Sequence, residues 1–189
     1  VFTDKFHYRA WKAIADDMGI YFDEKINNRL RGVSRMDSLE IILERYEGKL
    51  LTMAEKVSLA EKKNQIYREL LRTMTPEDVS EEVRDTLKKL HVDGFKLAIG
   101  SSSKNTKFIL EKVELIDAFD AVSDGTNITR SKPDPEVFQK AAKYLRVAPE
   151  ECAVVEDAFA GIDAAKSGGM YAIGIGEASK YEKADAHIE

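Results

Sequence analysis

The sequence predicts an α/β protein with two unequal parts, a parallel-sheet core of Rossmann-like layout and an inserted bundle of helices. In the first part of the chain, up to about Thr73, apolar residues recur at helical spacing. From Val79 onward, short apolar segments alternate with helical ones. This alternation is typical of right-handed βαβ units, and therefore of a parallel sheet.

The helical bundle is expected to contain three main segments. Apolar stripes at helical spacing run over residues 6–18 and 39–46, and a long third helix begins at Thr52. This third helix should end before Thr75-Pro76, because a proline restricts the backbone of the residue that precedes it. Each stripe needs apolar partners, which the other helices of the bundle supply.

The second part is expected to fold as a parallel sheet covered by helices. Asp134-Pro135 is typical of a helix N-cap followed by proline at the first helical position. Gly168-Gly169 can end a helix, because glycine accepts positive φ. The candidate strands are residues 96–99, 121–122, 152–155 and 171–175, and the candidate helices are residues 83–90, 105–114, 136–145 and 158–167.

Composition and charge exclude several classes of protein. The 189 residues, 43% hydrophobic and 33% charged, fit a compact core with a small inserted domain rather than a disordered chain. A net charge of −5 gives no general basic surface, so we expect a small substrate and no nucleic-acid partner. No apolar run reaches the roughly 20 residues of a membrane span, and no secretory pattern is present. Cys152 is the only cysteine, which fits a reducing compartment, and we expect a cytoplasmic protein.

Polar residues follow three of the expected strands, at the edge where parallel α/β sheets bind ligands. Ser101, Ser102, Ser103, Lys104 and Asn105 come after the first strand and before a helix. Hydroxyl groups and the free N–H groups of a helix N-terminus are suited to a phosphate. Simple N-capping is the alternative, and it is the more common role of an isolated serine cluster.

Glu156 and Asp157 follow the third strand. Mg²⁺ prefers carboxylate oxygens and keeps several waters, so one direct and one indirect carboxylate would help to form an octahedral site. The alternative is a helix N-cap with an acidic first turn. Lys132, in a rigid turn before a helix, can reach the same edge, although a lone lysine is more often a solvated surface charge.

Together these three features predict a phosphoryl-transfer site. A metal, a phosphate cradle and a cation supply the positioning and the charge stabilisation on which this chemistry depends. One component is missing, because no residue of the chain is an obvious nucleophile.

The same residues resemble the motifs of the haloacid dehalogenase superfamily. Its second motif is a strand that ends in Ser or Thr, its third a lysine and its fourth an acidic pair, and Ser101, Lys132 and Glu156-Asp157 match them in order. Its first motif, D-x-D-G, carries the nucleophilic and the acid/base aspartates and is expected just before Val1. Asp4 is no substitute, because it lies beyond that motif.

Within this superfamily the chain resembles the β-phosphoglucomutase family over nearly its whole length. The loop with Arg35 is the most specific feature, because phosphatases of the superfamily share the core motifs without it. The resemblance implies an α-helical cap domain at residues 5–74, inserted in a core formed by residues 1–4 and 75–189. The matching segments are residues 7–12, 30–35, 62–64, 101–105, 131–133 and 155–157.

The resemblance also implies a metal and a first phosphate site. Asp157 would coordinate Mg²⁺ with support from Glu156. Ser101 and Lys132 would bind the transferring phosphate, and with His7 they form the catalytic set that the chain contains.

A second phosphate site is implied in the cap. Arg35 would hold the other phosphate of a bisphosphate intermediate with Ser103 and Asn105, because an arginine fork matches that anion. His7 and Lys63 would lie at the hinge between cap and core. The remaining substrate-binding residues that the resemblance implies are Trp11, Gly32, Val33, Ser34, Ser102 and Lys104.

For several of these residues a purely structural role is the alternative. His7 and Trp11 can be packing residues of an amphipathic helix. Arg35 can be a surface charge, and Lys63 can belong to a solvated helix face with Glu61 and Lys62.

The implied activity is interconversion of β-D-glucose 1-phosphate and D-glucose 6-phosphate by a monomeric, Mg²⁺-dependent enzyme, through a phospho-aspartyl enzyme and glucose 1,6-bisphosphate. A sugar-phosphate or phosphoglycolate-type phosphatase is the first alternative, and a catalytically inactive binding module is the second. A metal-independent dehalogenase is disfavoured, because it does not need the acidic pair. Compared with the family pattern, the chain is about two residues shorter between Asp4 and His7, and it is expected to stop before the final strand and helix.

Overall fold

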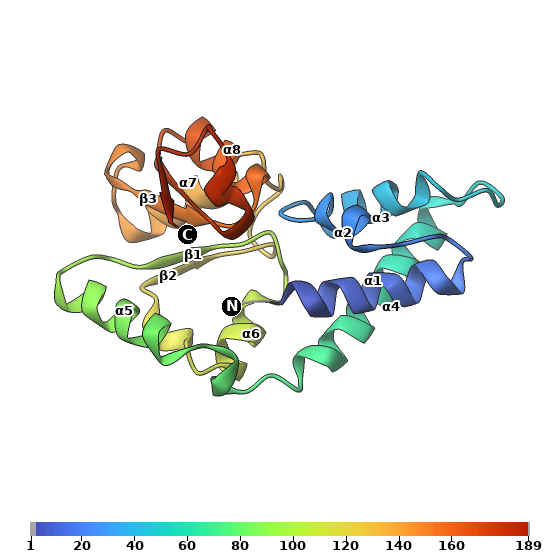
Figure 1. Cartoon of the computed structure of the whole chain (residues 1–189), viewed down its shortest axis with the longest axis horizontal. Helices are drawn as coiled ribbons and strands as arrows, with labels where there is room; N and C mark the ends of the chain where they lie inside the picture. Colours follow the sequence, from blue (N-terminus) through green and yellow to red (C-terminus); the bar gives the residue numbers. More distant parts are fainter. Residues whose placement is uncertain (1–2, 189) are drawn as a thin grey trace.

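The computed structural model describes residues 3–188 and places a helical bundle beside an α/β core (Figure 1). Val1 and Phe2 lie outside the described residues, as does Glu189. The expected core segment 1–4 therefore begins outside the part of the chain that is described here.

The bundle is held together by the apolar stripes that its sequence predicts. Trp11, Ile14, Leu39 and Ile42 meet in one buried cluster, and α1 packs along α4 (Figure 1). Thr52 begins α4 in a capping box, because its hydroxyl and the Glu55 carboxylate each accept the other residue's backbone N–H. The helices of the bundle are α1 (Asp4–Asp17), α2 (Glu24–Asn28), α3 (Arg35–Leu43) and α4 (Met53–Leu71).

The core alternates short strands with helices, as expected. Its strands are β1 (Ala98–Gly100), β2 (Ala121–Ser123), β3 (Ala153–Glu156), β4 (Tyr171–Ile175) and β5 (Ala186–Ile188). Its helices are α5 (Glu81–Val92), α6 (Thr106–Lys112), α7 (Glu136–Leu145) and α8 (Phe159–Ser167). Short 3₁₀ turns lie at η1 (Pro76–Asp78), η2 (Ile116–Ala118), η3 (Pro149–Glu151) and η4 (Gly176–Lys180).

All strand pairs of the core are parallel, as predicted, but they form two sheets. β1 pairs with β2, with Ile99 opposite Val122, and β3 pairs with β4, which pairs in turn with β5. Within residues 3–188, one edge of β1 and one edge of β3 have no strand partner. Val155 of β3 is 56% exposed, because one face of this strand is uncovered, which is unusual for valine in a parallel strand.

The structure differs from the expected elements in two places. The expectation that the chain stops before a final strand is wrong, because β5 pairs with β4. Asp185 fixes this strand by accepting the N–H of Ala172 at 2.7 Å and pairing with Lys166 at 2.6 Å. The expected N-cap at Asp134 is displaced by one residue, because α7 has Pro135 at its N-cap. Gly169 has a φ of +76°, as expected after α8.

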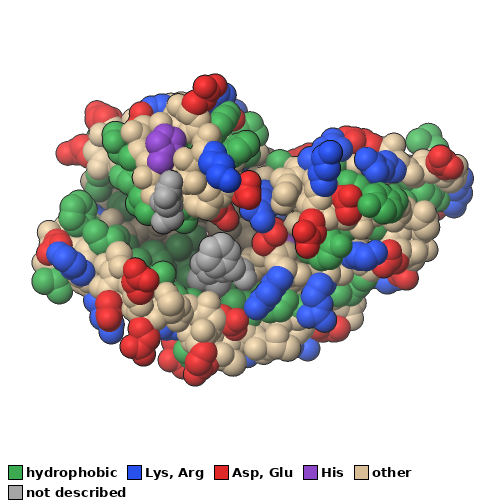
Figure 2. Space-filling view, in the orientation of Figure 1, with side chains coloured by type: hydrophobic (Ala, Val, Ile, Leu, Met, Phe, Trp, Pro, Cys, Tyr) green, Lys and Arg blue, Asp and Glu red, His purple; other side chains and the backbone are tan. Residues whose placement is uncertain are grey.

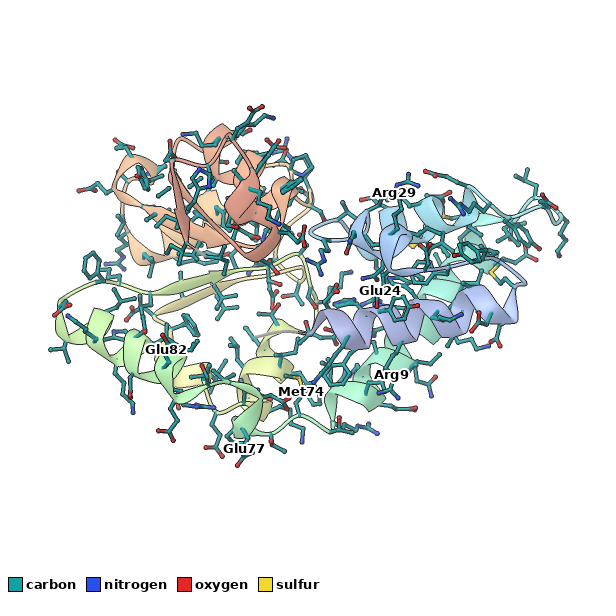
Figure 3. The ribbon with its side chains drawn as sticks, in the orientation of Figure 1. Arg9, Glu24, Arg29, Met74, Glu77 and Glu82 are labelled. Carbon is teal, nitrogen blue, oxygen red and sulfur yellow. The ribbon has the colours of Figure 1, made fainter. Side chains whose placement is uncertain are left out.

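A second apolar cluster joins the bundle to the core. Phe6 of α1 and Tyr67 and Leu71 of α4 are buried in the same cluster as Ile109 and Leu110 of α6. Figure 3 shows Met74, which belongs to this cluster, where the chain passes from α4 into the core. The bundle therefore rests on the serine-rich end of the core, next to β1.

Charged side chains of both signs are interspersed on the face in Figure 2, and a hollow lies in the α/β core, on the left of the view. The labelled charged residues of Figure 3, such as Arg9 of α1 and Glu82 of α5, are exposed. Over residues 3–188, every helix is too short or too polar to cross a bilayer.

Candidate active site

A cleft of about 780 Å³ lies between the bundle and the core. Its walls come from α1, α3 and α4 on one side and from the carboxyl ends of β1 and β3 on the other. The structure brings all the site residues that the sequence analysis named to this cleft. They are His7, Trp11, Gly32, Val33, Ser34, Arg35, Lys63, Ser101, Ser102, Ser103, Lys104, Asn105, Lys132, Glu156 and Asp157.

Lys132 and Glu156 form a buried ion pair in the wall of the cleft. The two side chains are only 8% and 9% exposed, and Lys132 Nζ contacts Glu156 Oε1. Lys132 also lies over the ring of Phe138, 4.7 Å from its centroid. Gly161 makes room for the pair, because a Cβ there would lie 2.2 Å from Glu156 Cδ. Lys132 is therefore no solvated surface charge.

Asp157 lines the cleft directly after Glu156. Within the described residues no group of three acidic, histidine or cysteine side chains could enclose a metal. Mg²⁺ does not need such a cage, because it commonly takes one or two carboxylates, several waters and phosphate oxygens of the substrate. The residues present fit that mode of binding, with Asp157 available and Glu156 already engaged by Lys132.

The serine-rich loop after β1 is partly self-bonded. Ser101 Oγ accepts the N–H of Ser103 at 3.2 Å, and Ser103 Oγ accepts the N–H of Asn105 at 3.1 Å. These bonds are the ones expected if the serines only stabilise the turn and cap the helix that follows, α6. Each hydroxyl still has its own proton to donate toward the cleft.

Arg35 meets the core through Asn64, a residue of α4 to which the sequence analysis gave no role. Asn64 Oδ1 accepts from Arg35 Nη2 at 2.8 Å and from Asn105 Nδ2 at 2.9 Å. A second contact crosses the cleft, because Ser102 Oγ donates to the carbonyl of Gly32 at 3.0 Å. Burial lowers the pKa of Arg35. This arginine has a neutral partner and faces the cleft, which is suited to an incoming anion.

The half-buried His7 and the buried Lys63 form a second pair at the root of the cleft. Lys63 Nζ lies 2.8 Å from His7 Nδ1 and lies over the rings of Trp11 and Tyr67 at 4.9 and 4.5 Å. Lys63 is 3% exposed, so the solvated-face alternative is wrong for this residue. Burial, and then the charge of Arg35, lowers its pKa to about 7. Burial also lowers the pKa of His7 well below its usual value.

The lowered pKa of Lys63 makes stability depend on pH. Between pH 7 and about 10.4 the unfolded chain binds more protons at Lys63 than the folded protein. The free energy of unfolding should therefore rise with pH in this window, by at most about 1.4 kcal/mol per unit from this residue. In the Lys63→Met variant, the free energy of unfolding measured by urea titration at pH 7, 8 and 9 should no longer rise with pH. Lys62→Met is the matched control, because Lys62 is 55% exposed and pairs with Asp17, and it should keep the rise. Equal slopes for both variants and wild type would contradict the assignment.

Three further residues of the cleft were missed by sequence reasoning. Asp4, the first residue of α1, accepts from Asn27 Nδ2 at 3.2 Å and from Arg31 Nη2 at 3.0 Å. Asn27 is 3% exposed, so the bond satisfies a buried amide. The sequence gives little indication of these contacts, because they join residues more than twenty positions apart.

Comparison with known proteins agrees with this fold and site. The family model for haloacid dehalogenase-like hydrolases matches residues 1–169. β-Phosphoglucomutase from Bacillus subtilis is 43% identical over 185 residues, covering 97% of this chain and 81% of that protein. The crystal structure of β-phosphoglucomutase from Clostridium difficile matches with a TM-score of 0.92 and 36% identity, over 99% of this chain and 84% of that one.

Phosphatases are more distant relatives. Fructose-1-phosphate phosphatase from Escherichia coli is 28% identical over 176 residues, covering 92% of this chain and 89% of that protein. By its sequence, its fold and its relatives, this chain belongs to the haloacid dehalogenase-like hydrolase family and, within it, to the β-phosphoglucomutase family.

Proposed function

We propose that this protein transfers phosphoryl groups and interconverts β-D-glucose 1-phosphate and D-glucose 6-phosphate through glucose 1,6-bisphosphate. The observation that carries the proposal is that two cationic side chains enter one cleft from different walls, one from the core and one from the bundle. Lys132 lies beside the carboxylates at the end of β3, and Arg35 reaches into the same cleft from α3. A bisphosphate requires a binding group for each of its phosphates, whereas a simple phosphatase requires only one.

In the core subsite, Lys132 and Ser101 bind the phosphoryl group that is transferred. Lys132 is held by Glu156, so its ammonium is already oriented and desolvated before the substrate arrives. Asp157, with support from Glu156, would hold Mg²⁺, which when bound neutralises developing charge on the phosphoryl oxygens.

In the second subsite, Arg35 binds the phosphate that is not being transferred. Asn105 and Ser103 lie on the opposite wall, and Asn64 connects Arg35 to Asn105. The guanidinium fork can form two parallel hydrogen bonds to a phosphate. These bonds orient the sugar phosphate and also increase its affinity for the cleft.

The nucleophile of this reaction is expected in the D-x-D-G motif ahead of Val1, as the resemblance implies. The unpaired parallel edges of β1 and β3 support that expectation, because a strand between them would end beside Ser101 and Glu156. Its aspartate would take the phosphoryl group as a phospho-aspartyl intermediate.

Residues 5–74 are proposed to act as a cap over the core of residues 1–4 and 75–189. Closure of the cap would exclude water from the phospho-aspartyl group, so that a sugar hydroxyl accepts the phosphate instead. His7 and Lys63 lie at the base of the bundle, where α1 and α4 approach the core, and are proposed to respond to the substrate there.

The test uses the native polypeptide, with whatever precedes Val1, and Mg²⁺. We expect glucose 6-phosphate to form from β-D-glucose 1-phosphate only when a glucose 1,6-bisphosphate primer is supplied. Release of inorganic phosphate without isomerisation would favour a sugar-phosphate phosphatase. Substrate binding without turnover of either kind would favour an inactive binding module.

A further inference from the structure

Lys132 lies in the connection between β2 and α7, residues 124–135, and residues 129–136 around it are called here the Lys132 loop. None of the hydrogen bonds within residues 3–188 involves the backbone of Lys132 itself. The position of its ammonium group therefore depends on how the two ends of the loop are fixed.

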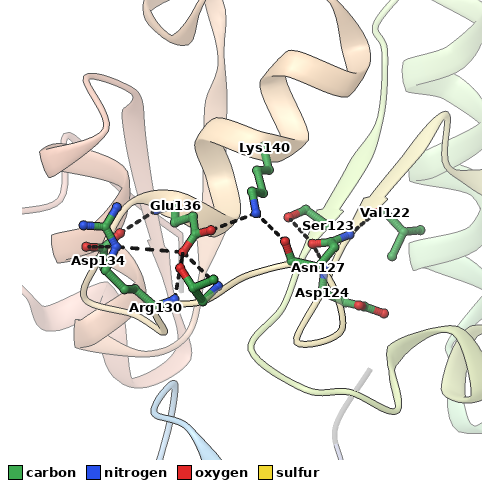
Figure 4. A network of polar contacts seen from close by, with 9 residues as sticks. Val122, Ser123, Asp124, Asn127, Arg130, Asp134, Glu136 and Lys140 are labelled. Atoms are coloured by element: carbon green, nitrogen blue, oxygen red, sulfur yellow. Dashed lines mark hydrogen bonds and ion pairs between the residues drawn. The ribbon is translucent and has the colours of Figure 1, made fainter.

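Glu136, the first residue of α7, closes this loop. Its Oε2 accepts from the N–H and the hydroxyl of Thr129 at 3.0 and 2.9 Å, and from the N–H of Arg130 at 2.7 Å (Figure 4). A single carboxylate oxygen thus holds the two residues that precede Ser131 and Lys132. Lys140, one turn along α7, pairs with Glu136 Oε1 at 2.8 Å. These bonds lower the pKa of Glu136 to about 2, so it stays ionised across the working pH range.

The closure continues to the end of β2. Lys140 Nζ donates to the carbonyl of Asn127, and Asn127 Oδ1 accepts from Ser123 Oγ at 3.3 Å and from the N–H of Asp124 at 3.1 Å (Figure 4). Ser123 and Asp124 are 0% and 1% exposed, so this end of the network is anchored in the interior.

The far side of the loop is fixed by a second carboxylate. Asp134 Oδ1 accepts the N–H of Glu136 at 2.9 Å, and Asp134 Oδ2 lies 3.2 Å from Arg130 Nε (Figure 4). The N–H of Asp134 also donates to the carbonyl of Ser131 at 3.0 Å. Both flanks of Lys132 are therefore bonded to the start of α7, while Lys132 alone projects to Glu156.

We propose that Glu136 is a positioning residue, which acts through the backbone of Thr129 and Arg130 to hold Lys132 at the phosphate subsite. This inference rests on the proposed role of Lys132 as a phosphate ligand. Glu136 does not line the cleft and so touches no substrate. Among binding measurements, the effect of changing Glu136 should appear only in those that depend on Lys132.

Glu136→Gln tests this role, because the amide keeps the size of the side chain but loses its charge and half of its acceptors. The probe is inorganic phosphate, titrated by calorimetry into protein with saturating Mg²⁺. We expect the Kd for phosphate to be about tenfold higher than in wild type. A change of this size corresponds to weakening one hydrogen bond between the charged Lys132 and the phosphate. The Kd for Mg²⁺, titrated without phosphate, should change less than about twofold, because Asp157 is outside the network.

Glu55→Gln is the matched control for a merely structural effect. Glu55 makes the same kind of bonds at the start of α4, to the N–H and hydroxyl of Thr52 at 2.8 and 2.9 Å and to Lys49 at 2.8 Å. Its pKa is likewise about 2. Glu55→Gln should lower the Tm by about as much as Glu136→Gln does, and it should leave the Kd for phosphate unchanged.

A double variant decides between positioning and general loosening. In a Lys132→Met background, Glu136→Gln should no longer change the Kd for phosphate. An unchanged Kd in the single variant, or an equal change in both backgrounds, would overturn the proposal. Should Glu136→Gln not fold, Glu136→Asp keeps the charge but shortens the reach, and the same results are expected of it.

The outcome is separable from that of the proposed function. Wild type that binds phosphate through Lys132 but shows no mutase turnover would refute the proposed function and leave the role of Glu136 supported or refuted by the titrations alone.

Discussion

Lys132→Met is expected to reduce kcat about 10³-fold and to lower the free energy of unfolding by about 3–5 kcal/mol. The activity falls because an oriented cation is lost from the phosphate subsite. The stability falls because Glu156, 9% exposed, is left as an unpaired charge in the interior. Turnover of the native polypeptide and urea denaturation at pH 7 measure the two effects.

The companion variant for this prediction is Lys132→Met with Glu156→Gln. Removing both charges should restore most of the lost stability, because no buried ion remains unpaired. Activity should stay low, because the cation is still absent. If the single variant were as stable as wild type, the ion pair would not be buried in solution as it is in the structure.

Arg35→Ala is expected to reduce kcat/KM for mutase turnover by about 10²–10³-fold. Hydrolysis of a simple ester such as p-nitrophenyl phosphate should change less than about threefold, because that substrate has only one phosphate and needs only the core subsite. Arg35→Lys should give an intermediate loss, since it keeps the charge without the fork. Both rates are measured on the same enzyme preparation with Mg²⁺.

Arg29→Ala is the control for this comparison. Arg29 lies in the same bundle and forms a forked pair with Glu44 at 2.8 Å, but it does not line the cleft. Both rates should stay near those of wild type in this variant. Equal losses of mutase and ester hydrolysis in Arg35→Ala would count against a dedicated site for the second phosphate.

The site was accessible to sequence reasoning because parallel strands bring their carboxyl ends to one edge. Ser101 and Glu156 follow two different strands, and that rule alone places them together. Lys132 was harder, because a lysine in a turn carries no signal of burial. Arg35 could be assigned only by resemblance, since nothing in its local pattern separates it from a surface charge.

What the sequence could not reveal depends on contacts between distant or irregular segments. Lys63 lies beside Lys62 in a charged run, and only the packing of α1 against α4 buries one and exposes the other. Glu136 bonds back to Thr129 through a loop with no periodicity. β5 was missed because three residues, Ala186–Ile188, are too few to show alternation.

The hydrogen bonds that join the two walls of the cleft affect how easily a ligand can enter and leave. Ser102 to Gly32 and Asn105 to Asn64 are neutral hydrogen bonds, each contributing about 1 kcal/mol. By themselves, two such bonds contribute only about thirtyfold to the preference for closed walls over parted ones. In the proposed reaction, the entry or release of a sugar phosphate can therefore part these walls without unfolding either of them.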